Sequence, residues 1–374
     1  MKKILIKHTL SFTLLCLLLV SVLFSIGCTN DENTTNTTTH YIPDTDTPDT
    51  NEKGEPHMAL HLSYNRDGYA TVTGYYWCTQ AEGTHDLAGD YCFDSETGTL
   101  TIPETGSDNR PIVAIYFNAF KDFQELEHVI LPKGFKQIGD NAFQNCNNLK
   151  TVTLSDETQE IASYAFAGCE ALESISPLTS LKTLGGSAFE GCKALKEIDL
   201  GSQLDFIGRR AFACSGLTSV TLPENARPAD EVFYECRDLK KATITGPLGM
   251  YMELPRATFA YCTSLETVSL SKEIIIIGES AFMGSGLTYI TLPPFVSTIH
   301  SDAFRNCSKL ESISIAYPNG GLLIDQDAFS GCSALHSIYW GHDKDGFRDT
   351  IINDGNEALQ NAPNQYYGLY KEEK

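Results

Sequence analysis

The sequence predicts an α/β solenoid of about ten turns, in which each turn adds one short strand to a parallel sheet. A β-rich cap precedes the turns and a short cap follows them. One motif recurs: IGDNAFQNCNNLKTV begins at residue 138, IASYAFAGCEALESI at residue 161 and LGGSAFEGCKALKEI at residue 184. Apolar residues also keep fixed places in each copy, so equivalent side chains can stack from one turn to the next.

Phenylalanine marks each copy and sets the frame of the repeat. An aliphatic residue stands five positions before nearly every one of these phenylalanines, with Pro228 as the exception, and a leucine follows five or six positions after it. The ten phenylalanines lie 21 to 26 residues apart, at Phe120, Phe143, Phe166, Phe189, Phe212, Phe233, Phe259, Phe282, Phe304 and Phe329.

The L-x-x-I-x-L pattern after each phenylalanine is typical of a leucine-rich-repeat solenoid. We expect this segment to form parallel strands on the concave face of a horseshoe or arc, about 4.8 Å apart. The I-G-x-x-A-F segment then forms the other wall, as a tight bend or a short helical turn. Since one turn cannot cover its own apolar face, each turn depends on its neighbours.

Cysteine stands three residues before the leucine in eight of the ten turns. Equivalent side chains of a stack point the same way, which is poor geometry for a ladder of disulfides. The sequence has no C-x-x-C spacing with matching histidines, so we expect no zinc column. We interpret the column as packing by small buried side chains: Phe123, Cys146, Cys169, Cys192, Cys214, Cys236, Cys262, Gly284, Cys307 and Cys332.

The N-terminus predicts export. Residues 1–27 resemble a lipoprotein signal peptide, with three lysines in the first seven residues, a long apolar run and the sequence SIGC at its end. Cys28 would then take the lipid and become the mature N-terminus. The alternative is an uncleaved membrane anchor. Both readings place the rest of the chain outside the cytoplasm.

Four further regions follow the signal. Residues 28–57 are rich in Thr and Asp and have no aliphatic run, so we expect a disordered tether. Residues 58–110 form the N-terminal cap, residues 111–340 the solenoid and residues 341–374 the C-terminal cap. Caps are needed because the ends of a solenoid expose apolar surface.

Two cysteines, Cys78 and Cys92, lie in the N-terminal cap, outside the repeat. We expect them to form a disulfide, because a small exported cap gains stability from a cross-link.

The repeat resembles that of the BspA-like leucine-rich-repeat family, of the surface lipoprotein type. The columns A-F, C-x-x-L-x-x-I-x-L-P and I-G carry the resemblance, over about residues 100–340. The segment LTIPETGSDNRPIVAIYFNAF is similar to a first turn of that family, and GNEALQNAPNQYY to a closing turn. The resemblance implies a secreted or surface protein that attaches to host matrix proteins or to other cells.

Composition and motifs exclude several classes of function. The net charge of −21 repels nucleic acid and anionic membranes, so we expect no nucleic-acid partner and membrane contact through the lipid anchor only. No G-x-S-x-G, P-loop, G-x-G-x-x-G or H-E-x-x-H motif occurs. His57 and His61 are interpreted as solvated. The sequence predicts a monomeric, non-catalytic protein without cofactor or metal.

The outward side chains of the predicted strands are mostly Ser and Thr, interrupted by pairs such as Glu197 with Asp199. Tyr289 and Tyr339 are the only aromatic residues among them. The main hypothesis is a surface protein that binds a protein partner. A glycan-binding module would stack sugar rings on these tyrosines and on Trp340, and an enzyme would need a site in the N-terminal cap.

Two insertions fall at the same edge of the solenoid, between a strand and the wall that follows it. TGPLGMYMEL carries Met250, Tyr251 and Met252, and AYPNGG carries Tyr317. Insertions in repeat proteins often map to the binding face, so we predict partner contact there. Alternatively, the two methionines cover the weak turn at Ala242.

Replacing Cys28 with Ala tests the lipid anchor. We expect the variant to lose fatty-acid labelling in cells and to accumulate as uncleaved precursor, because the lipidated thiol directs cleavage. Labelling at the wild-type level would contradict the anchor.

Overall fold

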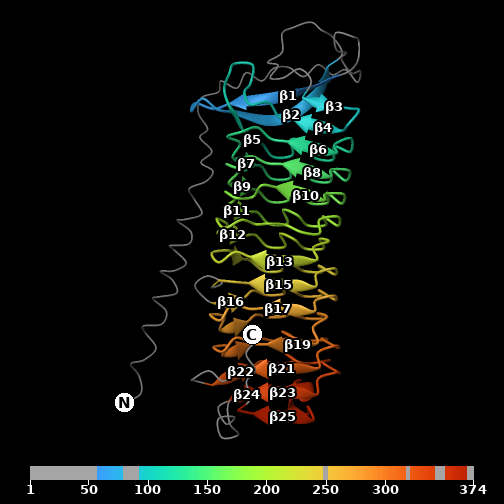
Figure 1. The fold of residues 1–374 in the computed structure, drawn as a ribbon, viewed down its shortest axis with the longest axis vertical. Coiled ribbons are helices and arrows are strands. Elements are labelled where there is room, and N and C mark those ends of the chain that lie inside the picture. The colour runs from blue at the N-terminus through green and yellow to red at the C-terminus, as the bar shows by residue number, and fades with distance from the viewer. Residues whose placement is uncertain (1–56, 79–91, 247–251, 317–320, 342–349, 369–374) are drawn as a thin grey trace, which may run out of the picture. The chain divides into compact units, whose positions relative to one another are not determined.

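The computed structural model describes residues 57–78, 92–246, 252–316, 321–341 and 350–368. The chain divides into two compact units, Met1–Asp46 and Thr47–Lys374, and all the described residues belong to the second. The predicted signal peptide, Cys28 and nearly all of the tether lie outside them. Within the second unit the chain winds into stacked coils, as the repeat predicts (Figure 1).

One wall of the coils is built from the L-x-x-I-x-L segments, and we call it the strand wall. It consists of three sheets with parallel pairing throughout, apart from the antiparallel β3–β4 pair. Its strands are β3 (Phe93–Asp94), β4 (Thr99–Thr101), β6 (His128–Ile130), β8 (Thr151–Thr153) and β10 (Ser174–Ser176); β13 (Ser219–Leu222), β15 (Lys241–Ile244) and β17 (Thr267–Ser269); β19 (Tyr289–Thr291), β21 (Ser312–Ile315), β23 (Ser337–Trp340) and β25 (Asn364–Tyr367).

The opposite wall is also made of strands, most of them two residues long. It consists of two sheets. The first contains β1 (His57–Tyr64), β2 (Ala70–Cys78), β5 (Ile112–Ile115), β7 (Gln137–Ile138), β9 (Glu160–Ile161), β11 (Thr183–Leu184), β12 (Phe206–Ile207) and β14 (Arg227–Pro228). The second contains β16 (Glu253–Leu254), β18 (Ile276–Ile277), β20 (Thr298–Ile299), β22 (Leu322–Ile324) and β24 (Thr350–Ile352).

The bend after each short strand is tight rather than helical. One residue of the bend takes a left-handed conformation in nearly every coil, as Asn141, Tyr164 and Ser187 do. The glycine before it allows close packing of coils: a Cβ on Gly185 would lie 2.3 Å from the Ser163 amide nitrogen. Among the described residues the α-helix is limited to α2 (Glu357–Gln360). Because strands form both walls, the coil spacing is similar on the two sides, and the stack in Figure 1 bends little.

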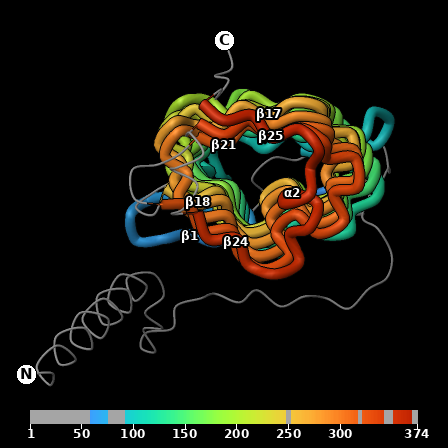
Figure 2. The backbone as a smooth tube through the Cα atoms, turned by 90° about the horizontal axis from the view of Figure 1, so that it is seen from below, coloured from blue at the N-terminus to red at the C-terminus, as the bar shows by residue number. Residues whose placement is uncertain are grey.

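The phenylalanines form a continuous ladder through the core, as the sequence predicts. All ten rings are fully buried. Neighbouring ring centroids lie 4.9–5.7 Å apart with interplanar angles of 3–14°. Figure 2 looks along the stack and shows the coils superimposed, with β17, β21 and β25 on one side and β18 and β24 on the other.

Caps continue this architecture at both ends. The antiparallel hairpin β1–β2 pairs through β2 with β5, and the Tyr75 ring stacks on Phe120 at 5.7 Å and 7°, which extends the ladder by one aromatic ring. At the other end β24 and β25 each add a strand to one wall. The buried Asn356 amide group donates to the backbone carbonyl of Asp325.

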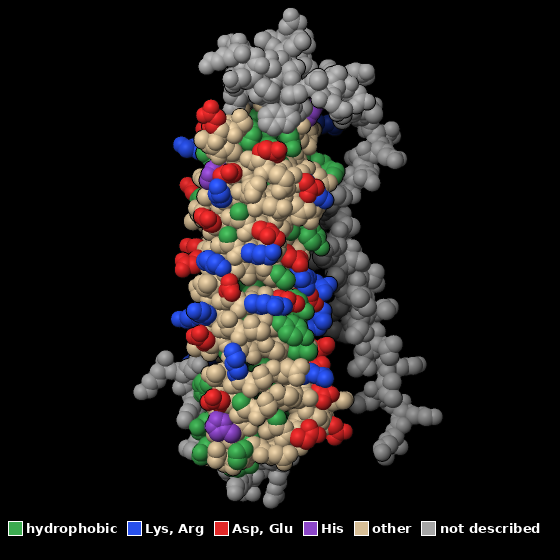
Figure 3. All heavy atoms as spheres, turned by 90° about the vertical axis from the view of Figure 1, so that its right-hand side faces the viewer, with side chains coloured by type: hydrophobic (Ala, Val, Ile, Leu, Met, Phe, Trp, Pro, Cys, Tyr) green, Lys and Arg blue, Asp and Glu red, His purple; other side chains and the backbone are tan. Residues whose placement is uncertain are grey.

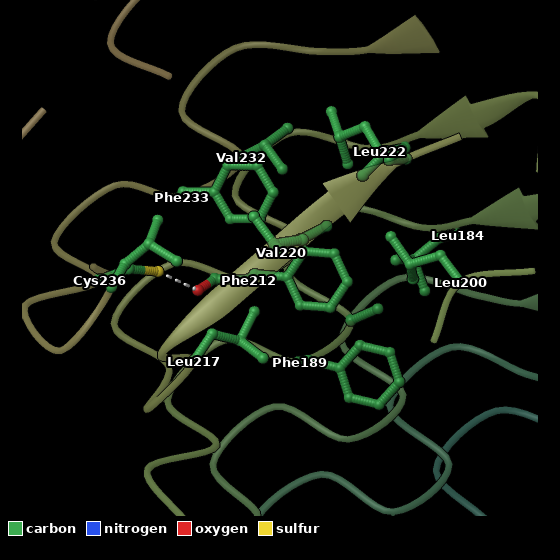
Figure 4. Close-up of a cluster of buried hydrophobic side chains, with 14 of the residues drawn as sticks. Leu184, Phe189, Leu200, Phe212, Leu217, Val220, Leu222, Val232, Phe233 and Cys236 are labelled. Atoms are coloured by element: carbon green, nitrogen blue, oxygen red, sulfur yellow. Dashed lines mark hydrogen bonds between the residues drawn. The ribbon is translucent and has the colours of Figure 1, made fainter. Parts of the chain in front are cut away.

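The buried thiols donate hydrogen bonds from coil to coil. The Cys146 Sγ donates to the Phe120 carbonyl oxygen at 3.1 Å, and the Cys236 Sγ to the Phe212 carbonyl oxygen at 3.0 Å (Figure 4). The same bond recurs at Cys169, Cys192, Cys262, Cys307 and Cys332. The column is therefore packing, reinforced by a weak donor.

Two members of the predicted column are wrong. Counting back from leucine placed Cys214 and Gly284 in it, but the structure places Ser215 and Ser285 there, both buried. The column lies three residues after the phenylalanine, and these two coils have a shorter link to the leucine. Cys214 and Gly284 take a second left-handed position, two residues after the phenylalanine, where Gly168 and Gly191 stand in other coils. The Ser215 Oγ lies 3.4 Å from the Cys236 Sγ, so a hydroxyl can fill the column.

Phe189→Ala should lower the free energy of unfolding by about 3–5 kcal/mol, because it opens a cavity inside the ladder. The matched control is Phe206→Ala, since Phe206 is 44% exposed, and we expect a change of about 0.5 kcal/mol or less. Urea denaturation measures both. Similar losses in the two variants would show that the ladder does not dominate stability.

Alkylation with N-ethylmaleimide should distinguish the column from Cys214. Burial raises the pKa of Cys146 and of Cys236 to about 12, so both thiols stay neutral at about pH 8 and hidden from the reagent. Cys214 is only partly buried. We expect mass spectrometry to find Cys214 labelled in the folded protein and the column labelled only after denaturation. Rapid labelling of Cys146 in the folded state would contradict the packing role.

Candidate binding site

The strand wall is interrupted at the coil that contains Ile198. β10 ends one sheet and β13 begins the next, and the segment Glu197–Asp199 between them forms no strand. At most other coils a backbone bond joins neighbours at this level: the Glu173 N–H donates to the Lys150 carbonyl at 2.8 Å, and the Thr218 N–H to the Lys196 carbonyl at 2.9 Å. The wall has a second break between β17 and β19. Within the described chain the corresponding bond from Lys196 to Glu173 is absent.

Pro177 contributes to this interruption, although the second break of the wall, between β17 and β19, has leucine at the equivalent position, Leu270. Pro177 stands where other coils have an aliphatic residue whose N–H bonds the next coil, as the Leu154 N–H does to the Ser176 carbonyl at 2.9 Å. Proline has no N–H, so it cannot donate to Asp199. Proline is accordingly confined to the edges of sheets. β10 is therefore the last strand of its sheet, although the next coil still packs beside it: a Cβ on Gly201 would lie 2.6 Å from the Leu178 carbonyl oxygen.

A hollow of about 660 Å³ opens at this interruption. Its floor is apolar, formed by Ile175, Ile198 and Val220 from three consecutive coils. Ile198 is partly exposed, whereas the equivalent residue of every other strand in the repeat is buried. An exposed aliphatic residue in a depression of a polar wall is the usual composition of a binding site.

Two carboxylates flank the exposed isoleucine. Glu197 and Asp199 are both exposed and line the hollow. The Asp199 Oδ1 accepts from the Gly201 N–H at 3.0 Å, which holds the loop after the segment. Among the described residues neither carboxylate forms an ion pair, since the nearby Lys196 pairs with Asp238 at 3.0 Å. The hollow therefore carries local negative charge beside an apolar floor.

Several charged side chains elsewhere on the surface form ion pairs. Ion pairs join neighbouring coils, as between Lys193 and Glu170 at 2.7 Å, and Figure 3 shows basic and acidic side chains interspersed along one face. The buried Glu231 carboxylate accepts from Arg209, Arg210 and Arg256. Burial opposes ionisation of this carboxyl, but the arginines more than offset it and lower its pKa.

A second hollow, of about 360 Å³, lies where the opposite wall breaks between β14 and β16. It is lined by Asp230, Glu253, Arg256, Glu279, His300 and Ser301. Arg256 contacts Asp230 at 3.7 Å and Glu231 at 2.6 Å, and His300 contacts Asp325 at 2.8 Å. Of these lining groups Arg256, Asp230 and His300 are paired, the last with a residue outside the lining. The described part of the chain contains no group of three or more His, Cys, Asp or Glu arranged to hold a metal ion.

The structure separates the aromatic residues singled out from the sequence. The Tyr289 hydroxyl lies 2.5 Å from the Thr291 hydroxyl, and the Tyr339 ring stacks on Tyr366 at 4.9 Å. The expectation that Trp340 stacks on a sugar ring is wrong. Trp340 is 1% exposed, because it takes the inward leucine position of its strand, and its Nε1 donates to Gln365.

The predicted edge site can be placed only in part. Met250, Tyr251 and Tyr317 lie outside the described residues. Met252 is 37% exposed and stands directly before β16. Ala242, which the methionines were expected to cover, is buried. Partner contact at this edge remains a prediction.

The predicted disulfide also remains a prediction. The Cys92 Sγ lies 3.5 Å from the Met58 carbonyl oxygen, and Cys78 pairs in the hairpin with His57, the residue before Met58. The Cys78 side chain lies outside the described residues. The two cysteines thus belong to neighbouring parts of the cap.

Sequence reasoning missed the hollow, although two signals were present. Proline occupies the inward leucine position in that turn alone among the ten, at Pro177. Two carboxylates, Glu197 and Asp199, interrupt the Ser and Thr residues that line most of the wall. Together they indicate a missing backbone donor in the strand wall and a local cluster of negative charge beside it.

Comparison with known proteins identifies the repeat. Residues 113–240 and 252–345 match the family described as BspA type Leucine rich repeat region, in six copies. The gap between the two stretches includes most of the insertion that carries Met250 and Tyr251. No curated protein matches the chain. Among the described residues no helix has the length and apolar character needed to cross a bilayer.

Solved structures of bacterial repeat proteins are similar to the chain. A leucine-rich repeat protein from Bacteroides ovatus is 22% identical, with 75% of this chain and 92% of that chain covered and a TM-score of 0.31. A leucine rich cell surface protein from Faecalibacterium prausnitzii is 20% identical, with 79% of this chain and 97% of that chain covered and a TM-score of 0.36. The T. pallidum Leucine Rich Repeat protein is 19% identical, with 77% of this chain and 90% of that chain covered and a TM-score of 0.39.

Proposed function

Because the chain belongs to the BspA-type leucine-rich repeat family, we propose that it is a non-catalytic binding protein of the bacterial cell surface that holds a protein partner on its strand wall. The observation that carries the proposal is the hollow over Ile198. An apolar floor with flanking charge on a rigid sheet favours protein recognition, in which a buried apolar contact supplies affinity and charge supplies specificity.

Export and lipid anchoring complete the proposal. Residues 1–27 have the composition of a lipoprotein signal, and Cys28 follows the small residue Gly27. The tether of residues 28–57 would reach up to about 100 Å when extended. A lipid on Cys28 would hold the solenoid to the membrane while the tether lets it reach a partner outside the cell, either a host matrix protein or another cell.

The chemistry of the hollow fits binding rather than catalysis. Its polar side chains are hydroxyls and two exposed carboxylates, and no cysteine, histidine or lysine lines it. Among the lining residues no histidine or lysine stands beside the hydroxyls to activate one of them as a nucleophile. The solenoid core is filled by the phenylalanine ladder, which leaves it no room for a substrate.

A glycan-binding module is the second candidate. The stack of Tyr339 on Tyr366, which is 38% exposed, is the observation in its favour. The burial of Trp340 removes one of the three aromatic residues that this function was expected to use. The glycan function therefore rests on fewer residues than the sequence indicated.

An array of host matrix proteins printed beside a glycan array tests the two functions. Wild-type protein should bind a protein spot, Ile198→Asn should lose that binding because a polar side chain replaces the apolar floor, and Tyr366→Ala should keep it. Binding to glycan spots alone, with loss in Tyr366→Ala, would favour the second candidate. Binding to neither array would overturn both.

A further inference from the structure

Three exposed aromatic side chains gather on the opposite wall near the N-terminal cap. Tyr116 and Phe117 directly follow β5, and both are more than half exposed. Their ring centroids lie 4.8 Å apart in an edge-to-face pair. Tyr164, nearly half exposed, follows β9, two coils further along the stack (Figure 1). We call these three side chains the aromatic patch. Large apolar side chains that are exposed together are typical of an interaction site.

Backbone bonds fix the three coils of the aromatic patch relative to one another. The Asn118 N–H donates to the Asp140 carbonyl at 3.0 Å, and the Asn141 N–H to the Ser163 carbonyl at 2.9 Å. Phe117, Asp140 and Ser163 therefore take the same place in successive coils, and the residue after Ser163 is the third aromatic residue of the patch. Two coil spacings cover about 10 Å, so one short partner segment can span the patch.

Two carboxylates lie on the same three coils. Asp140 stands in the coil between the rings, and its Oδ1 accepts from the Ser163 N–H at 3.0 Å. Burial and the negative charge of Asp140 raise the pKa of Glu160, so the two carboxyl groups are close enough to interact. Within the described chain neither forms an ion pair, and Lys136 of the same region pairs with Glu157 at 3.7 Å. The rings are therefore accompanied by negative charge that no basic side chain neutralises.

We propose that the aromatic patch binds an arginine- or lysine-containing segment of a protein partner. The cationic side chain lies over the aromatic rings and pairs with Asp140 and Glu160. The inference goes beyond the proposed function, because it assigns a second contact surface on the opposite wall, separate from the hollow over Ile198.

The chemistry of the aromatic patch fits a cation. The face of an aromatic ring carries negative potential, which attracts an ammonium or, more often, a guanidinium group. A guanidinium group can at the same time donate two hydrogen bonds to a carboxylate. The chain as a whole carries a net charge of −21, which steers a basic segment toward the surface before contact.

Two other occupants fit less well. The rings of Tyr116 and Phe117 are inclined at 61°, so they form no continuous flat platform for a sugar ring. A second copy of the chain would present the same negative charge to the patch, and two patches in contact would bring their carboxylates together without a counter-charge. A basic segment satisfies both the rings and the carboxylates.

Fluorescence anisotropy with the purified protein tests the inference. The probe is a short capped peptide that alternates arginine and glycine. A second peptide has citrulline in place of each arginine, which keeps the shape of the side chain but removes its charge. We expect the arginine peptide to bind and the citrulline peptide to bind at least about tenfold more weakly.

Aromatic variants locate the contact. Phe117→Ala with Tyr164→Ala should weaken binding of the arginine peptide about tenfold, because the cation loses two rings. The matched control is Phe206→Ala with Phe295→Ala, which removes two exposed rings elsewhere and should change binding by less than about twofold. Thermal melts establish that each variant is folded.

Charge variants separate local pairing from net charge. Asp140→Asn with Glu160→Gln should weaken binding about tenfold, and asparagine keeps the oxygen that accepts from the Ser163 N–H. Glu266→Gln with Glu311→Gln removes the same charge from exposed positions on the strand wall and should change binding by less than about twofold. Ile198→Asn should leave binding unchanged, because the hollow lies on the strand wall.

Several outcomes would overturn the inference. Failure of the arginine peptide to bind, or equal binding of the citrulline peptide, would exclude recognition of a cation. Equal loss in the two charge variants would reduce the effect to net charge, and loss in Ile198→Asn would place the peptide in the hollow. A glycan spot, or a dimer in sedimentation, that is lost in Phe117→Ala with Tyr164→Ala would identify a sugar or a second copy as the occupant.

Discussion

Stacking of the phenylalanine rings forces every coil to follow the path of its neighbours. The rings lie 4.9–5.7 Å apart, close to the spacing of strands in a sheet, so one ladder in the core fixes the rise of both walls. In seven coils the buried thiol adds a bond to the phenylalanine carbonyl of the coil before it. A coil that departs from this path loses contacts on two sides.

This constraint confines irregularity to the surface. Beneath the hollow, Phe166, Phe189 and Phe212 stack at 5.5 Å without a break, and β11 pairs with β12 in the opposite wall. Pro177 removes one donor from the strand wall while the core remains continuous. The site is therefore an opening on a rigid support, which lowers the entropy lost on binding.

The sequence predicted most of the repeat because large apolar residues at fixed spacing leave one way to stack. It predicted the phenylalanine ladder and the packing role of the thiols. It misplaced Cys214 and Gly284 because it counted from the leucine, whereas burial is set by distance from the phenylalanine. Trp340 was taken as a surface residue, although its strand position points inward.

The candidate site was harder to predict because it depends on a hydrogen bond that is missing. A pattern of side chains does not show which backbone donors a neighbouring coil requires. Only the ladder from Lys150 to Glu173 and from Thr218 to Lys196 reveals that the bond from Lys196 to Glu173 has been lost. The missing bond shows that the carboxylates of Glu197 and Asp199 flank an opening in the strand wall.

Amide hydrogen exchange of the free protein measures this gap directly. Our account predicts that the amides of Glu197 and Asp199 exchange much faster than those of Thr151 and Thr153, which pair in β8, and that Pro177→Leu slows them. Equal protection of the two segments in the wild-type protein would contradict it, because the strand wall would then be closed at Ile198.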